Sequence, residues 1–417
     1  MSLLSVVTAH NVYHLLLPSF LIHLTRGLTL TSVPLFVLYH LELSKSHVGI
    51  AVGAIGLGKV LSDIPCGYLL GRIGSRNLMI VCGAIVGSAS TVMMMALSAS
   101  NAAFMLVTIS MFFVGVGEST GIISRLAIVT DEHPLEERGR ISALLGGSTR
   151  IAMAVGPLLS GVLTMIFGIG SVFVVQFILA LASVAVVLTI SIPSVEPTPK
   201  IPISPSSYRD HIRILTHVIV FVIALQLVRE CRKLVVPLSG NEIGMSVEEI
   251  SFYSSLSFTL DALLFAAAGP LMDTHGRVFT GCFSVSIMVL SLSILVPAIN
   301  PIGIFFHSVI SGVGNGFSSG LVIAFGADLA PQHNRSEFLG MFRLFADSGE
   351  LLGPLIVGLV AQYASIPTML NVVSSVGVLG AFWLIRFVNE SPVARTKSEV
   401  PVQAELIGKD QETDSRI

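Results

Sequence analysis

Two related stretches of sequence decide the fold of this chain: Gly156-Pro157-Leu158-Leu159-Ser160-Gly161 and Gly353-Pro354-Leu355-Ile356-Val357-Gly358. Around them, residues 115–162 align without gaps on residues 312–359. The alignment keeps polar residues that are rare in such an apolar chain, for example Asp131 with Asp328. An internal repeat of this length predicts two copies of one structural unit.

The composition around the repeat is that of a membrane protein. Of the 417 residues, 53% are hydrophobic and 12% are charged, whereas a soluble domain carries about 25% charged residues. A membrane-spanning helix needs roughly 20 apolar residues. The chain contains twelve such runs, at 14–39, 47–70, 78–98, 102–130, 140–167, 170–192, 214–238, 247–271, 279–299, 302–329, 337–362 and 367–388. The runs are continuous rather than alternating, which excludes a β-barrel. The sequence therefore predicts an all-α polytopic membrane protein with twelve transmembrane helices in two pseudo-symmetric six-helix bundles.

A segment rich in proline and serine separates the sixth run from the seventh. We expect an N-terminal bundle over 1–192, a linker over 193–213, a C-terminal bundle over 214–388 and a disordered tail over 389–417. One set of loops carries nearly all the basic residues, namely Arg72, Arg76, Arg138, Lys200, Arg209, Arg277 and Arg335. Because basic loops stay on the cytoplasmic side, we expect both termini to be cytoplasmic. We expect the plasma membrane rather than an organelle.

Other classes of function find no support in the sequence. The net charge of -2 gives no reason to expect a nucleic-acid partner. The four cysteines lie in apolar runs without metal-ligand spacing, so we expect neither disulfides nor a metal site. Hydrolase, metalloprotease and nucleotide-binding signatures are absent from the sequence. We therefore expect no enzyme activity and no cofactor, with a proton gradient as the source of energy.

A glycine-rich loop follows the second span of each half. The second copy reads Gly269-Pro270-Leu271-Met272-Asp273-Thr274-His275-Gly276-Arg277, and the first reads Gly67-Tyr68-Leu69-Leu70-Gly71-Arg72-Ile73-Gly74. With the repeat, these loops resemble the major facilitator superfamily over essentially the whole chain, and its drug/proton antiporter-like branch in particular. The resemblance implies gating loops at Gly67, Gly71, Arg72, Gly74, Gly269, Asp273, Gly276 and Arg277. Gly71 stands where the family pattern has an aspartate, and Met111 stands where it has an arginine.

Charged residues inside spans mark candidate functional positions, because each costs at least ~2.5–3.5 kcal/mol near the bilayer centre. The sequence nominates a solute and proton pathway at Arg26, Glu118, Arg150, Arg229, Glu230, Asn315, Arg343, Asp347 and Glu350. Glu118 is the candidate proton carrier, since removal from water favours the protonated form of a carboxylate. Arg26 is the candidate to bind a substrate anion or to compete for Glu118.

Helical spacing and the repeat predict particular charge pairs. Lys59 and Asp63 are four residues apart and share a helix face, which favours an intrahelical pair. The repeat aligns Asp261 with Lys59, so Asp261 is a candidate to form an ion pair with Lys59. The repeat also places Arg150 opposite Asp347. We expect a salt bridge between the halves there that forms in one conformation and breaks in the other.

The two Gly-Pro pairs occupy equivalent places in the fifth and eleventh spans. Proline removes an intrahelical hydrogen bond, and glycine lets a neighbouring helix approach closely. We expect kinks at Gly156, Pro157, Gly353 and Pro354 that suit a rocking motion, with a static kink as the alternative.

The sequence as a whole favours a secondary transporter, a monomer in the lipid bilayer that moves a small organic solute by alternating access. Parallel repeats of this kind place the solute site near the bilayer midplane, between the halves. Proton-coupled efflux by antiport is the favoured mechanism. A facilitative or proton-symport carrier of a metabolite anion is an alternative that suits the buried arginines. A non-transporting sensor on a transporter scaffold is an alternative that suits the departures at Gly71 and Met111.

Overall fold

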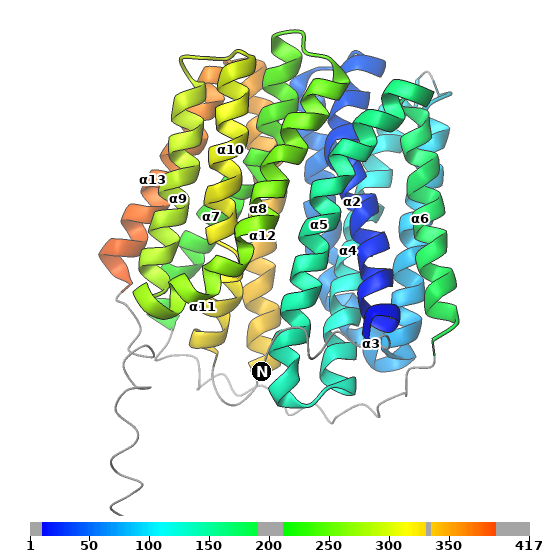
Figure 1. The fold of residues 1–417 in the computed structure, drawn as a ribbon, viewed down its shortest axis with the longest axis vertical. Coiled ribbons are helices and arrows are strands. Elements are labelled where there is room, and N and C mark those ends of the chain that lie inside the picture. The colour runs from blue at the N-terminus through cyan, green and yellow to red at the C-terminus, as the bar shows by residue number, and fades with distance from the viewer. Residues whose placement is uncertain (1–10, 100, 191–211, 331–334, 389–417) are drawn as a thin grey trace, which may run out of the picture.

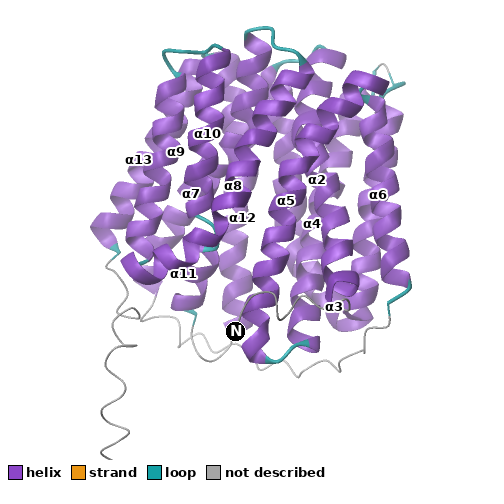
Figure 2. Cartoon of the chain, in the orientation of Figure 1, coloured by secondary structure: helices purple, strands orange, loops and turns teal. Residues whose placement is uncertain are grey.

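The computed structural model describes residues 11–99, 101–190, 212–330 and 335–388, and its regular structure within these ranges is helical (Figures 1 and 2). The first half contains η2 (Val12–Leu16, a π-helical turn), α2 (Leu17–Leu35), η3 (Phe36–His40, also π-helical), α3 (Lys45–Ala96), α4 (Ala103–Glu132), α5 (Leu135–Phe167) and α6 (Gly170–Leu188). The second half contains α7 (Ile212–Glu242), α8 (Val247–His275), α9 (Arg277–Leu295), α10 (Pro301–Phe317), α11 (Leu321–Leu329), α12 (Arg335–Tyr363) and α13 (Ile366–Phe387). The expected linker and tail lie outside the described residues, except that α7 already begins at Ile212.

The long helix α3 accounts for two predicted spans. Eleven helices of the described chain are long and apolar enough to cross a membrane, and α3 is one of them with 52 residues. A straight helix of that length would extend about 80 Å, far more than the ~30 Å hydrocarbon core. Gly74 breaks it with φ 78° and ψ 167°, a backbone conformation open to glycine. The described residues therefore provide twelve spans, and the predicted all-α fold of two six-helix halves is confirmed.

The tenth span departs from the single run expected over 302–329. It is split into α10 and α11, and Gly320 between them adopts a left-handed conformation with φ 76°. Ser318 and Ser319 lie in the break, where the helical hydrogen-bond pattern stops. Backbone irregularity at membrane depth is tolerated where it is buried in protein or lines a polar cavity. The break therefore marks a polar position in the second half.

The two halves meet along two seams, α3 against α12 and α5 against α8. Both seams are tight near one end of the bundle. A Cβ built on Gly49 of α3 would lie 2.5 Å from the carbonyl oxygen of Pro354 and 2.9 Å from the Cα of Gly358. A Cβ on Gly161 of α5 would lie 2.7 Å from the Cβ of Ser251. The pseudo-symmetric halves thus use small residues at equivalent crossings.

Polar contacts between the halves reinforce this closed end. Lys45 forms an ion pair with Glu242, and the Tyr39 hydroxyl donates to the carbonyl oxygen of Met245 at 2.8 Å. The end of the bundle at which α6 ends and α7 begins is called the linker end. The end that carries these polar contacts is called the opposite end. At the linker end, a Cβ built on Gly67 or Gly269 would meet no atom within 4 Å. The seams are therefore packed at the opposite end and open out toward the linker end.

Helices α6, α9 and α13 lie at the periphery, as the absence of acidic and basic residues from most of their length predicts. Their principal helix contacts are within their own half. Their outer faces expose large apolar side chains such as Ile178, Leu290 and Leu379. Exposed apolar faces of this kind suit a lipid environment. The helices that carry charged residues within their spans lie at the interface between the halves.

Candidate functional site

A first charged network lies in the N-terminal half and is completed by one residue of the other half. Arg26 of α2 contacts Glu118 of α4, with 2.6 Å between Nε and Oε1, and Glu350 of α12 at 3.1 Å. Lys59 of α3 contacts the same two carboxylates, at 3.3 and 2.5 Å. All four side chains are at most 12% exposed. Two cations and two carboxylates therefore share four contacts in a buried, electrically balanced set.

The surroundings of the first network are also polar. Lys233 and Glu230 of α7 form a 2.5 Å pair that acts electrostatically on Glu350. A cavity of about 20 Å³ borders Arg26 and Glu118 and is also lined by His23 and Arg125. That volume accommodates about one water molecule. The cavity therefore offers room for about one water molecule beside Arg26 and Glu118.

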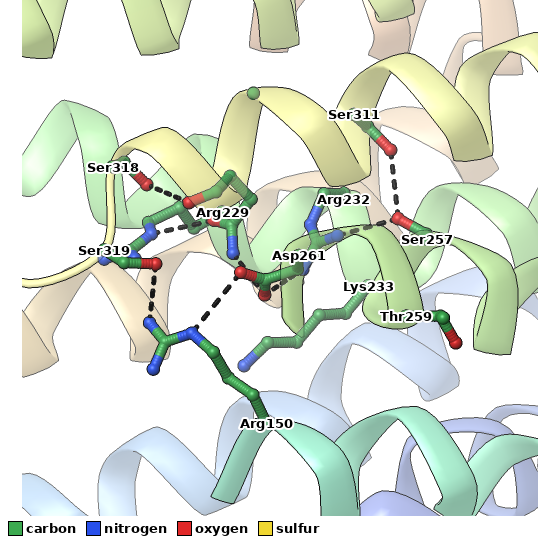
Figure 3. A network of polar contacts seen from close by, with 12 residues as sticks. Arg150, Arg229, Arg232, Lys233, Ser257, Thr259, Asp261, Ser311, Ser318 and Ser319 are labelled. Carbon is green, nitrogen blue, oxygen red and sulfur yellow. Dashed lines mark hydrogen bonds and ion pairs between the residues drawn. The ribbon is translucent and has the colours of Figure 1, made fainter. Parts of the chain in front are cut away.

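A second network is centred on Asp261 of α8 and lies in the C-terminal half (Figure 3). Arg150 reaches Asp261 from α5 of the first half, at 3.5 Å, and donates to Ser319 at 2.8 Å. Arg232 of α7 contacts Asp261 at 3.6 Å and donates to Ser257 at 2.7 Å. A single carboxylate therefore faces two guanidinium groups.

Asn315 of α10 ties a third guanidinium group into the second network. Its amide nitrogen donates to Asp261 at 2.7 Å, and its amide oxygen accepts from Nε of Arg229 at 2.9 Å. Arg229 also donates to Gln226 at 2.8 Å. The second network therefore gathers three arginines around one aspartate.

The two networks occupy equivalent positions in the repeat. Arg229 corresponds to Arg26, Asp261 to Lys59, and Asn315 to Glu118, and the contact of Arg26 with Glu118 reappears as that of Arg229 with Asn315. Each network receives one residue from the other half. Glu350 of α12 enters the first network, and Arg150 of α5 enters the second.

The structure differs from the three pairings expected from the sequence. Arg150 pairs with Asp261 in the described conformation, so the expected pair with Asp347 is not formed here and stays a prediction for the other conformation. Asp347 instead contacts Arg343 at 3.3 Å within α12. Lys59 turns to Glu118 and Glu350, and Asp63 accepts a hydrogen bond from Ser119, so the expected Lys59–Asp63 pair is wrong. Asp261 forms ion pairs with Arg150 and Arg232 rather than with Lys59.

These errors have one physical cause. Spacing along a helix and symmetry in a repeat identify the faces of a helix, but the packing of α3 and α5 against the opposite half decides which charges meet. Two partners were also missed: Gln226 and Ser257 are neutral and carried no charge signal. The only hint of Gln226 is its place three residues before Arg229, on the same helix face.

The two segments expected to form gating loops are helical up to Gly74 and Gly276, and they differ as their sequences predict. In the second copy, Arg277 contacts Asp273 and Asp328, each at 3.2 Å, and so joins α8 and α9 to α11. In the first copy no carboxylate stands at Gly71, and Arg72 donates to the Tyr68 hydroxyl of its own helix. Gly74 and Gly276 both have positive φ, at 78° and 90°. The turn is therefore shared by both halves, whereas the ion pair is present in the C-terminal half.

The Gly-Pro pairs lie inside helices that continue through them. Proline occurs within α5 and α12 at positions 157 and 354, and both helices remain helical past these positions. Gly156 packs against Gly27 of α2, where a Cβ would lie 2.3 Å from the backbone. Gly353 packs against Glu230 and Leu227 of α7. The glycines therefore serve close helix approach, and the rocking role of the prolines stays a prediction.

The described residues contain no group of three His, Cys, Asp or Glu side chains that could hold a metal ion. Fold and site together define an integral multi-pass membrane protein with two pseudo-symmetric halves and buried charges between them. A family model described as Major Facilitator Superfamily matches residues 15–230 and 222–411, and the chain belongs to this superfamily.

Relatives within the family differ in what their names say they carry. The chain is 27% identical over 180 residues to "Multi-drug resistance efflux pump PmrA homolog" of Lactococcus lactis, covering 42% of this chain and 44% of that protein. It is 30% identical over 142 residues to "Probable galactarate/D-glucarate transporter GudP" of Bacillus subtilis, covering 34% and 31%. Each match thus spans less than half of the relative. A solved D-xylose-proton symporter shares the fold with a TM-score of 0.72 at 13% identity, over 90% of this chain and 97% of that one.

Proposed function

We propose that this protein is a proton-coupled secondary transporter that exports a small organic solute by alternating access. The observation that carries the proposal is the position of Glu350, which joins the two halves and therefore replaces Glu118, the proton carrier expected from the sequence. The Glu350 carboxylate lies on α12 of one half and is shared by Arg26 and Lys59 of the other, at 3.1 and 2.5 Å. These contacts join the halves only while Glu350 is ionised.

Protonation of Glu350 would destabilise the first network and favour its opening. A neutral carboxyl group no longer balances Arg26 and Lys59, and an unbalanced buried charge is costly. Separation of α12 from α2 and α3 would then return the cations toward water. The charged groups that face Glu350 are Arg26 and Lys59, with Glu118 behind them and the Lys233–Glu230 pair beside it. A proton bound at Glu350 thus favours one conformation, and its release favours the other.

The direction of transport follows from the sidedness that the basic loops predict. With the linker end in the cytoplasm, the described conformation is closed outward and has its seams open inward. Glu350 is then ionised when solute enters from the cytoplasm, and takes up a proton when the protein opens outward. This order of events is that of antiport. The efflux pumps among the relatives support this direction.

The test requires no knowledge of the solute. In a variant with the four native cysteines replaced, Ser251→Cys reports on opening of the α5–α8 seam, because Ser251 is 1% exposed. We normalise its maleimide labelling in detergent to that of a fully exposed cysteine, which corrects for the loss of thiolate at lower pH. We expect this normalised rate to rise roughly tenfold on acidification, and Glu350→Gln to give fast labelling already at neutral pH. A normalised rate that is independent of pH while Glu350 is intact would overturn the proposal.

A matched control separates Glu350 from an exposed carboxylate that also joins the halves. Glu242 pairs with Lys45 at the opposite end, and its side chain is 49% exposed. Glu242→Gln should leave the pH response of Ser251→Cys labelling unchanged. If Glu242→Gln removes that response instead, the pH sensor is the exposed pair and not the buried network.

A further inference from the structure

Resting on the proposed function, we infer that the second network binds an organic anion, a small solute that carries a carboxylate or phosphate group. Arg150, Arg229 and Arg232 would hold the anionic oxygens, which would compete with Asp261 for the guanidinium groups. The network has an excess of positive charge, a buried arginine donor without a partner and one partly exposed arginine.

The second network has too few carboxylates for its arginines. Arg150, Arg229 and Arg232 act on one another electrostatically, and the only carboxylate that contacts any of them in the described chain is Asp261. The nearby Lys233 is already paired with Glu230. Buried charges in proteins are normally paired. The network therefore holds two positive charges more than its carboxylates balance, which is the charge of an anion-binding site.

The contacts of the arginines are correspondingly weak or neutral. Asp261 lies 3.5 and 3.6 Å from two guanidinium groups, longer than the 2.7–2.9 Å of a strong charge-assisted hydrogen bond. Arg229 donates to two amide oxygens, those of Asn315 and Gln226. Nε of Arg232 is buried and has no hydrogen-bond partner. A carboxylate or phosphate would supply the acceptors that these donors lack.

Aromatic rings fix the orientation of two of these groups. The guanidinium carbon of Arg150 lies 5.2 Å from the ring centroid of Phe265, and that of Arg232 lies 4.7 Å from the centroid of Phe258. A ring over the face of a guanidinium group leaves its edge, which carries the N–H donors, free for an acceptor. The rings thus hold the donors in position before an anion arrives.

The second network is partly exposed on the side of Arg150. The Arg150 side chain is 21% exposed and that of Lys233 is 14% exposed, whereas Asp261 and Arg232 are nearly covered. Figure 3 shows Arg150 reaching from α5 toward Asp261, with Ser319 in the break of the tenth span beside it. A solute at this place would contact both halves, as a substrate of alternating access must.

The test is equilibrium binding to the purified protein near neutral pH, by calorimetry, with probes that share one carbon skeleton. Gluconate, glucarate and glucose 6-phosphate are anions, glucose is the neutral control and glucosamine is the cationic control. We expect one or more of the anions to bind and the two controls not to bind. Equal binding of glucose, or binding of glucosamine alone, would overturn the inference.

Variants assign the binding to this network. Arg229→Gln should weaken anion binding roughly 10–100-fold, since it removes charged hydrogen bonds. Arg125→Gln, which removes a buried arginine of α4 in the other half, should leave binding unchanged. Asp261→Asn should instead tighten anion binding roughly tenfold, because it removes the carboxylate that competes for the same donors. A misfolded variant cannot bind more tightly, so weaker binding in properly folded Asp261→Asn would contradict the inference.

The outcomes separate this inference from the proposed function. If labelling of Ser251→Cys responds to pH while no anion binds, proton coupling stands and the anion site is wrong. If anions bind as expected while labelling ignores pH, the anion site stands and the coupling is wrong.

Discussion

The two charged networks lie at equivalent positions of the two halves, yet their charge balance differs. In the first, Glu350 brings a carboxylate to Arg26, Lys59 and Glu118 and completes an equal set of charges. In the second, Arg150 adds a further cation to a centre that already holds more cations than carboxylates. The repeat therefore determines where ionisable groups lie, and the residue type determines what they do. Protonation can disrupt the balanced charges of the first network, whereas the excess positive charge of the second network favours binding of an anion.

The largest expected effect comes from breaking the balance of the first network. Lys59→Met and Glu350→Gln should each destabilise the described conformation by about 3–5 kcal/mol, because each leaves a buried charge without its partner. The double variant keeps only the balanced Arg26–Glu118 pair, so most of the lost stability should return. Thermal unfolding in detergent measures all three variants. Losses that simply add in the double variant would show that the four residues do not act as one set.

Loss of Arg150, the residue that the second network receives from the other half, should lower stability less than loss of Glu350. Asp261→Asn is expected to cost about 3–5 kcal/mol, because it leaves buried guanidinium groups without their carboxylate. Arg150→Gln should cost less than about 1 kcal/mol, because Arg150 is partly exposed and its removal brings the network nearer to balance. A double-mutant cycle on thermal unfolding should couple Arg150 to Asp261 and leave Arg150 and Asp347 additive within about 0.5 kcal/mol. Coupling to Asp347 alone would restore the pairing that the repeat suggested.

That last contrast shows how far sequence reasoning reaches in this chain. The twelve spans were predictable because apolar runs and internal symmetry are written along the chain, and most charged members of both networks were recognisable as charges at membrane depth. Apart from the contact of Arg26 with Glu118, the partners were not predictable. Lys59 and Asp63 share a helix face, but the seam between α3 and α12 brings Glu350 closer to Lys59. Contacts across the seams depend on the relative placement of the halves, which spacing along one helix does not contain.

Neutral members of the site left still less trace. Asn315 was recognisable because an amide stands among glycines and serines in an apolar span. Gln226 and Ser257 resemble the many polar residues that pack between membrane helices, and they acquire a role through Arg229 and Arg232. The break at Gly320 was likewise hidden, since a glycine within an apolar run is compatible with a continuous membrane helix.

The seams offer a way to separate the two networks by steric means. Gly49→Leu should wedge α3 from α12, the helix that carries Glu350, and Gly161→Leu should wedge α5, the helix that carries Arg150, from α8. Each substitution forces a side chain against closely packed atoms, which costs about 1–3 kcal/mol. Thermal unfolding measures the loss, and calorimetric anion binding should weaken more for Gly161→Leu than for Gly49→Leu.

A glycine with open surroundings supplies the control for these wedges. A Cβ on Gly67 of α3 would meet no atom within 4 Å. Gly67→Leu should therefore leave the unfolding temperature and anion binding close to those of the unmodified protein. Equal damage from Gly67→Leu would mean that the wedges act through the helix itself and not through the seam.

The smallest expected effect concerns the gating loops, where the halves differ in a partly exposed ion pair. The Asp273 side chain is 76% exposed and that of Asp328 is 18% exposed, and both contact Arg277. Asp273→Gly, which copies the residue at Gly71, should therefore lower stability by less than about 0.5 kcal/mol, and Asp328→Asn by up to about 1 kcal/mol. Conversely, Gly71→Asp should change thermal unfolding little, since Ser75 stands where the second copy has Arg277. A large gain from Gly71→Asp would mean that this loop lacks only the carboxylate, and that the difference between the halves at this end is one of a single residue.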